Sequence, residues 1–177
     1  LMGQGKYKSA QGCMRMAVND LMLAYYWENG IMPRSQNRTL YLLKQNSPKI
    51  GGTALYDLFR GLYGLDTRGK TELKRQLLAA KEEISEVIVP RWGDSGMEFM
   101  EKAVDGQLEW GYETSIVYVY MWCIHLLDTK TMRQGAYDAP EFAQQLPALH
   151  AFLDFDRIDA QALERMMEQY RTLRQQV

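Results

Sequence analysis

The sequence predicts an all-α fold, a single compact domain of about seven or eight helices around an apolar, aromatic-rich central helix at about 108–128. Apolar residues recur at spacings of three and four along most of the chain, as on amphipathic helices. Only residues 115–120 have the β-branched and aromatic composition of a strand, and a lone strand could not satisfy its own backbone hydrogen bonds. The 177 residues contain no repeat or separating linker and match the size of one ordinary domain.

The first predicted helix covers residues 9–29 and follows a flexible or tag-derived start at 1–8, so the helical domain is expected to span 9–177. A short second helix is expected to follow, capped by Ser35 or Asn37. The stripe of the first helix that is expected to face the core consists of Cys13, Met16, Ala17, Asp20, Leu21, Ala24 and Tyr25.

Two further helices are expected before the central one. The first begins at Thr53, which can cap it. The second, at 71–88, has the clearest helical spacing of the chain, and Pro90 is expected to end it. The turn residues of RWGDSG predict a turn at 91–96, after which helical spacing resumes until Gly106.

The central segment contains an uncharged run of 12 residues, 116–127, in which His125 is the only strongly polar side chain. A helix that spans a bilayer needs about 20 apolar residues. The apolar block is also longer than a usual strand. The segment is therefore expected to be a buried helix and not a membrane span.

The last part of the chain is expected to begin with a polar loop at 129–139. A helix at 141–152 follows, interrupted by Pro147. Asp156 or Asp159 is expected to cap the final helix.

The composition is ordinary for a globular protein, with 46% apolar and 24% charged residues. No cationic start with an apolar run and a cleavage site is visible. Cys13 and Cys123 lie in apolar segments and are expected to be buried free thiols, which predicts a cytoplasmic protein; a single bridge in an exported protein is the alternative.

The net charge of −1 argues against a general nucleic-acid binder, but the charge is unevenly distributed. Residues 1–93 carry 14 Lys and Arg against 8 Asp and Glu, whereas residues 94–177 carry 7 against 14. Either the two halves fold together and their charges interleave, or the surface has one basic and one acidic face that steers partners.

The sequence assigns no catalytic residue, no metal site and no cofactor. Cys123 and His125 are two residues apart and point to different faces of a helix, so they form no zinc-ligand pair. A nucleophilic cysteine would need an exposed thiolate, and neither thiol is expected to be exposed.

The strongest hint of a ligand site lies at the start of the central helix. Glu113 enters the apolar helix beside Trp110 and needs a partner such as Arg91 if it is buried. An ordinary ion pair or a helix-start carboxylate explains it equally simply. The candidate ligand-binding residues are Trp110, Glu113, His125 and Arg91.

A basic stretch, TRGKTELKR, places Arg68, Lys70, Lys74 and Arg75 close together. These side chains are either a solvated helix start or a patch that contacts phosphates.

Taken together, these features predict a non-catalytic protein-binding module, such as a small bacterial immunity or regulatory protein that uses an acidic surface of its C-terminal half. The first alternative is a helical enzyme or small-molecule-binding protein, and the second is nucleic-acid binding through the basic N-terminal half. A protein partner is expected, no membrane, and a homo-oligomer is compatible with the sequence. The candidate partner-binding residues are Asp154, Asp156, Asp159 and Glu164.

Overall fold

The computed structural model describes residues 1–32, 38–48, 52–109 and 113–177, and within them every regular element is a helix. The predicted all-α fold is confirmed. The number of helices is larger than expected because short helices occupy segments predicted as loops. In chain order the α-helices are α1 (Tyr7–Glu28), α2 (Thr39–Asn46), α3 (Thr53–Tyr63), α4 (Lys70–Glu109), α5 (Glu113–Leu127), α6 (Thr129–Arg133), α7 (Pro140–Gln145), α8 (Pro147–Leu153) and α9 (Ala160–Arg174).

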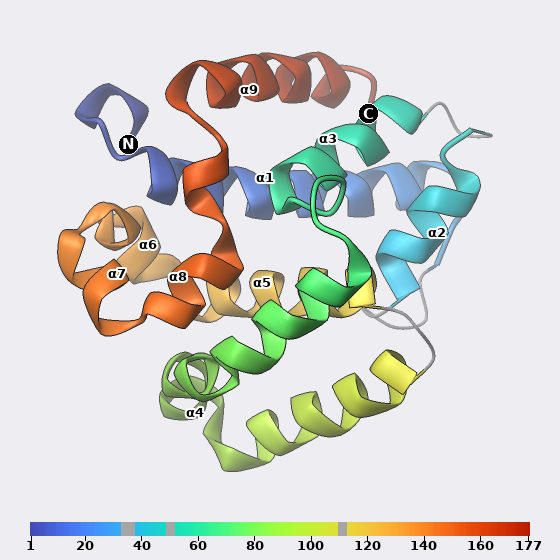
Figure 1. Ribbon diagram of the computed structural model, residues 1–177. Coiled ribbons are helices and arrows are strands. Elements are labelled where there is room, and N and C mark those ends of the chain that lie inside the picture. Colours follow the sequence, from blue (N-terminus) through green and yellow to red (C-terminus); the bar gives the residue numbers. More distant parts are fainter. Residues whose placement is uncertain (33–37, 49–51, 110–112) are drawn as a thin grey trace.

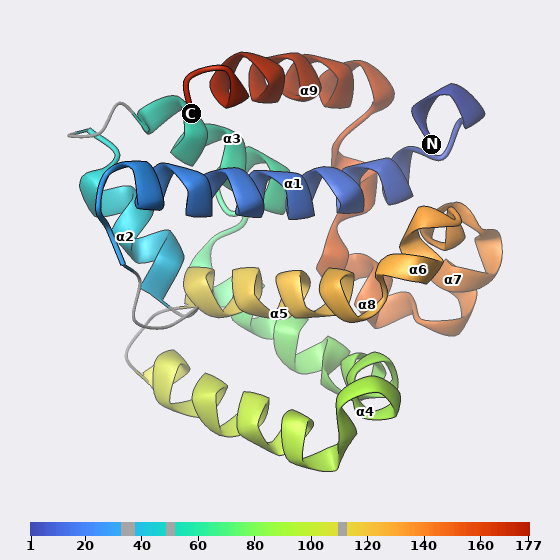
Figure 2. The ribbon, with the colours of Figure 1, turned by 180° about the vertical axis from the view of Figure 1, so that it is seen from behind.

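The helices form a stack whose middle consists of α1 and α5 (Figures 1 and 2). α9 contacts α1 on the side away from α5, and α4 contacts α5 on its other side. α3 contacts α1 and also packs the rings of Phe59 and Tyr63 against Tyr118 of α5. The short helices α6, α7 and α8 lie at one end of the stack, and α2 lies at the other. Because α1 and α5 are covered on both sides, their side chains supply much of the core.

The central helix is confirmed as α5, although residues 108 and 109, expected at its start, belong to α4. The side chains of α5 from Ile116 to Met121 are all buried. Val117, Tyr118 and Ile124 have no exposed surface at all. The β-branched residues of this segment are therefore accommodated in a helix, because tertiary packing outweighs their modest preference for strands.

The buried face of α1 differs from the predicted stripe. Asp20 is exposed, and Cys13 is only half-buried. The face of α1 that packs into the core carries polar as well as apolar side chains, so the spacing of apolar residues did not predict it as the buried face. Its large members are Gln11, Met14, Arg15, Val18, Asn19, Leu21, Met22, Tyr25 and Tyr26.

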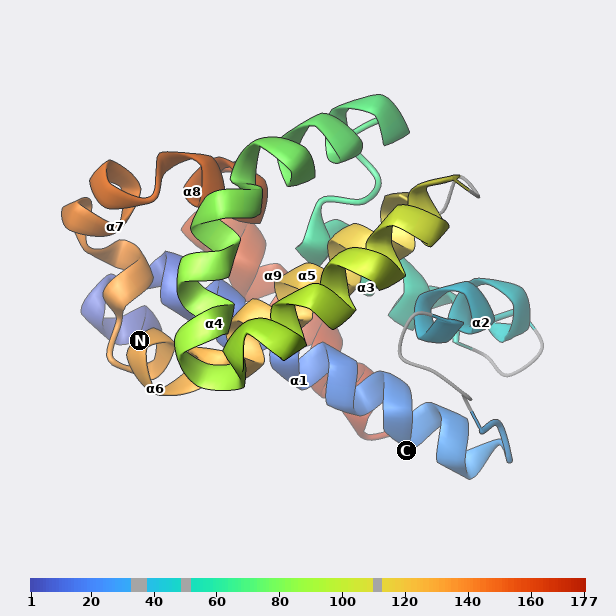
Figure 3. The same ribbon diagram turned by 90° about the horizontal axis from the view of Figure 1, so that it is seen from below.

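α4 is bent into two arms at Gly93, and the predicted end at Pro90 is wrong (Figure 3). Pro90 lies inside the helical run, whereas Gly93 has φ 78° and ψ 170°. That backbone region is accessible essentially only to glycine. The predicted turn at 91–96 therefore reduces to one residue, and the second arm continues past Gly106 to Glu109.

The C-terminal segments agree better with the sequence. Pro147 separates α7 from α8, as expected. Of the two candidate caps for the last helix, Asp159 fulfils the role, because its Oδ1 accepts a hydrogen bond of 2.7 Å from the Ala162 amide. The predicted caps of the second helix, Ser35 and Asn37, lie outside the described residues.

Three arginines hold the C-terminal end of α3. Arg15 comes from α1, Arg68 from the segment after α3, and Arg157 from the 3-10 helix η4 (Phe155–Arg157). Their guanidinium groups satisfy helix-end carbonyls that would otherwise lack donors and complement the negative end of the helix dipole. The acceptors are Gly61 O for Arg157, Leu62 O for Arg15 at 2.9 Å, and Tyr63 O and Gly64 O for Arg68 at 2.8 and 3.0 Å.

Candidate functional site

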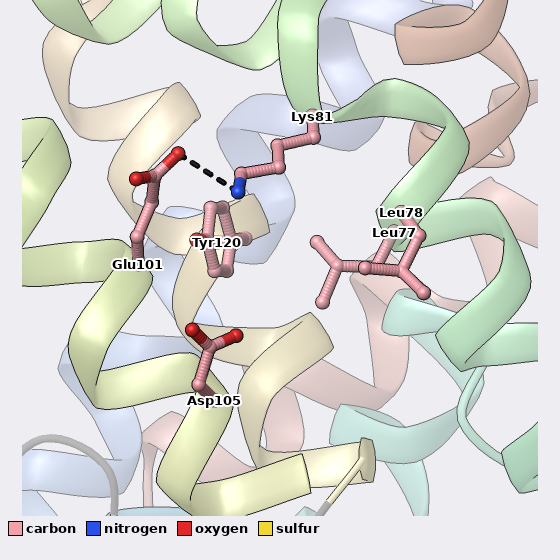
Figure 4. A pocket seen from close by; sticks show the side chains of 6 residues that line it. All are labelled: Leu77, Leu78, Lys81, Glu101, Asp105 and Tyr120. Carbon is pink, nitrogen blue, oxygen red and sulfur yellow. Dashed lines mark ion pairs between the residues drawn. The ribbon is translucent and has the colours of Figure 1, made fainter.

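The two arms of α4 and the adjoining face of α5 enclose a small pocket, which we name the α4 notch (Figure 4). The bend at Gly93 creates it, because it folds the second arm back beside the first across α5. The cavity volume is about 20 Å³, room for one water molecule. Its walls are formed by Leu77, Leu78, Lys81, Glu101, Asp105 and Tyr120.

The rim of the α4 notch is charged and its wall is apolar. Lys81 Nζ lies 3.0 Å from Glu101 Oε1, so an ion pair joins the two arms. Asp105 follows Glu101 by one helical turn and is exposed, and no ion pair to it exists among the described residues. Leu78 is 52% exposed at the opposite rim.

Tyr120 forms a buried wall of the α4 notch. Burial, and then the carboxylates of Glu101 and Asp105, raise the pKa of its hydroxyl well above the ordinary value of 10.0. The phenol therefore stays protonated at neutral pH and is suited to donating a hydrogen bond and not to acting as a base.

The candidate ligand-binding residues are only partly placed. His125 has no exposed surface, and its Nδ1 lies 3.4 Å from the Tyr137 hydroxyl. Burial, and then Arg15, hold the pKa of His125 well below 6.5, so the ring is neutral. Arg91 donates to Asp128 Oδ1 at 2.7 Å.

Trp110 and the side chain of Glu113 lie outside the described residues. The structure thus brings neither of the two described members, His125 and Arg91, into the α4 notch. A ligand site around the four residues stays a prediction.

Most of the candidate partner-binding acids have bonds within the chain. Asp154 Oδ2 lies 2.8 Å from Arg157 Nε, and Asp156 Oδ1 lies 2.7 Å from Lys8 Nζ. Asp159 caps α9. Glu164 is exposed on α9. Their role as partner contacts stays a prediction.

The basic and acidic halves of the chain interleave in part. Ion pairs join the first half to the second at several points of the described structure, as the first interpretation of the charge split expects. These pairs are Lys8–Asp156, Arg68–Asp154, Lys81–Glu101 and Arg91–Asp128.

The basic stretch after α3 is partly structural. Arg68 donates to the end of α3 and to the Phe152 carbonyl at 3.0 Å. Arg75 pairs with Glu72 on the same helix, with 2.6 Å between Nη2 and Oε1. Lys74 is exposed. Arg68 and Arg75 of the proposed phosphate patch are therefore already bonded to protein atoms.

Both thiols are free, as predicted, but only Cys123 is fully buried. Burial raises the pKa of Cys13 and raises that of Cys123 to about 12. Neither environment favours the thiolate that a nucleophile requires. Among the described residues, no three His, Cys, Asp or Glu side chains converge on a position that could hold a metal ion.

The residues of the α4 notch were not identified from the sequence. Lys81 and Glu101 lie on opposite sides of the bend, and no local pattern pairs them. Arg15 was also missed, although one signal pointed to it: Met14, Val18 and Met22 surround it at helical spacing.

In the part of the chain that the structure describes, no helix is both long and apolar enough to cross a bilayer. Comparisons of the chain with models of protein families, with curated proteins and with solved structures find no match.

Proposed function

We propose that this protein is a non-catalytic protein-binding module that uses the α4 notch and its acidic rim to bind a basic partner. The observation that carries the proposal is the size and lining of the α4 notch. Its volume of about 20 Å³ is far below the roughly 300 Å³ or more of typical small-molecule pockets. A notch of that size suits the end of one side chain of a partner.

The lining favours a cationic side chain. The exposed Leu78 offers apolar surface for the alkyl stem of a lysine, and the Asp105 carboxylate offers a counter-charge for its ammonium group, which is about the size of a water molecule. The Lys81–Glu101 pair is an example within the chain of the same kind of contact.

The surrounding charge supports the same partner. Residues 94–177 carry twice as many acidic as basic side chains, and the second arm of α4 belongs to this half. An acidic surface raises the association rate with a basic protein and selects against acidic ones. A small bacterial immunity or regulatory protein that occupies a basic enzyme would use its surface in this way.

The test is a charge reversal at the rim. Wild type, Asp105→Lys and Glu168→Lys are used to capture partners from an extract of the source organism, and each captured protein is then purified and titrated calorimetrically. We expect one stoichiometric basic partner whose affinity falls by about tenfold or more with Asp105→Lys, since each like-charge contact costs on the order of 1 kcal/mol or more. Glu168→Lys is the matched control, because α9 lies on the opposite side of the molecule from α4 (Figure 1).

A third variant separates this surface from another exposed one. Trp27 near the end of α1 is 74% exposed, and aromatic side chains are enriched at interfaces. If Trp27→Ser abolishes binding while Asp105→Lys leaves it unchanged, the contact does not involve the α4 notch and the proposal is wrong.

A further inference from the structure

Three buried side chains of the core carry polar atoms that have no hydrogen-bond partner in the described part of the chain. Gln11 is 1% exposed, and Arg15 and His125 are 0% exposed. Within the described residues, Gln11 Oε1 and Nε2, Arg15 Nη2 and His125 Nε2 have no hydrogen-bond partner. Buried polar atoms are nearly always bonded to protein, water or an ion, so this group calls for a bound species.

Arg15 and His125 lie against one aromatic ring, and Gln11 lies one helical turn from Arg15 on the same face of α1. The guanidinium carbon of Arg15 lies 5.0 Å from the centre of the Phe155 ring, and the His125 ring lies 6.0 Å from the same centre. α1, α5 and η4 therefore contribute to one buried polar cluster, which we name the Arg15 cluster (Gln11, Arg15 and His125).

The charge around the Arg15 cluster is positive. Arg15, Arg68 and Arg157 donate to neighbouring carbonyls at the end of α3, and among the described residues Asp154 is the carboxylate that pairs with Arg68 and Arg157. Asp154 is itself shared between Arg157 at 2.8 Å and Arg68 at 3.7 Å. Three guanidinium groups thus face one carboxylate, and helix-end carbonyls offset only part of the difference.

The unsatisfied atoms are mainly donors. Arg15 Nη2 and Gln11 Nε2 can only donate. If His125 Nδ1 accepts from the Tyr137 hydroxyl, its Nε2 carries the proton and is a donor too. Gln11 Oε1 is the one acceptor of the group. A species that accepts hydrogen bonds and carries negative charge fits this set better than water does.

We propose that the Arg15 cluster binds a small monovalent anion of halide size, held by Arg15 Nη2 with Gln11 Nε2 and His125 Nε2 as further donors. Because all three side chains are buried in the core, only a small ion could be accommodated beside them. Such an anion neutralises a buried guanidinium that lacks a carboxylate partner of its own. It thereby ties α1 to α5 and η4, independently of what the α4 notch binds.

Bromide is the probe for the crystal. Crystals of the full chain are grown in sodium bromide, and diffraction is recorded above and below the bromine absorption edge. We expect one anomalous peak within hydrogen-bonding distance of Arg15 Nη2 and Gln11 Nε2. Density there without anomalous signal, as from water, would overturn the proposal.

Thermal unfolding tests the same site in solution. Melting temperature is measured against sodium bromide, with sodium gluconate to keep the ionic strength constant. We expect a logarithmic rise of roughly 4 °C for each tenfold increase of bromide above its dissociation constant. A melting temperature that does not respond to bromide refutes the site.

Two variants assign the effect to the cluster. Arg15→Met removes the charge but also loses the bond to Leu62 O, and it is informative only if it folds. Gln11→Leu keeps the shape and removes only unsatisfied atoms, so it should fold and lose most of the bromide response. Gln169→Leu on the exposed face of α9 is the control that should keep it. An unchanged response in Gln11→Leu would place the anion elsewhere.

Discussion

Replacing Gly64 with alanine tests whether the contacts that Arg15, Arg68 and Arg157 make at the end of α3 stabilise the fold. Gly64 ends α3 with φ 64° and ψ 31°, in the left-handed region. A Cβ built there lies 2.6 Å from Asp154 Oδ2 and 3.1 Å from Arg157 Nε. No pair of atoms tolerates the first distance, so either Asp154 or the end of α3 must move.

The cost has two parts. The left-handed backbone costs an alanine about 1 kcal/mol relative to glycine. Displacing Asp154 disturbs its ion pair with Arg157. The two side chains of this pair are 22% and 23% exposed, and loss of such a half-buried, hydrogen-bonded pair adds roughly 1–3 kcal/mol to the cost. The free energy of unfolding should therefore fall by about 2–4 kcal/mol in Gly64→Ala, and the melting temperature by roughly 5–12 °C.

Gly30→Ala is the matched control. Gly30 has φ 65°, but nothing lies within 4 Å of a Cβ built on it. It should lose only the backbone part, about 1 kcal/mol. Both variants are measured by urea denaturation followed by circular dichroism. If the free energy of unfolding falls equally in the two variants, the close packing of Gly64 against Asp154 and Arg157 contributes nothing to stability. The arginines at the end of α3 would then not stabilise the fold in the way described.

Two further predictions concern single side chains. Asp159→Ala removes the cap of α9 and should lower the free energy of unfolding by about 1 kcal/mol, whereas Glu164→Ala on the same helix should change it little; equal effects in thermal melts would contradict the cap. Because burial lowers the pKa of His125, the unfolded chain binds the proton before the folded chain does as the pH falls below 6.5. The free energy of unfolding therefore decreases below this pH by up to about 1.4 kcal/mol per pH unit. His125→Phe should flatten this loss between pH 6.5 and 5 in urea titrations, leaving a smaller slope from His150, whose pKa is also lowered; an unchanged slope would show that His125 is not the source.

Local patterns predicted the elements whose signals lie within a few residues. The uncharged run 116–127 predicted α5, because an apolar block of that length has few other places in a globular fold. Pro147 predicted the separation of α7 from α8, and of the two aspartates expected as caps of the last helix, Asp159 is the one that caps it. The helix end before the bend was placed at Pro90, because proline is the stronger helix breaker in isolation, whereas the turn predicted at 91–96 does contain the bend at Gly93.

The candidate sites were much less predictable. The ligand site expected around Glu113 rests partly on residues outside the described structure. The acids expected to bind a partner include Asp154 and Asp156, and both pair with cations of the first half. A charge that looks unpaired in the sequence is often paired in space, and nothing in its neighbourhood along the chain reveals the partner.

The sequence by itself determined that this chain is helical and that α5 is its buried centre. These properties follow from spacing and composition, which act over one or two helical turns. Only the tertiary structure decided which face of α1 is buried and where the two arms of α4 meet. Arg15 illustrates the reason: its charge disfavours burial when considered alone, and the groups that offset this cost, the end of α3 and the rings of Tyr63 and Phe155, are distant in sequence.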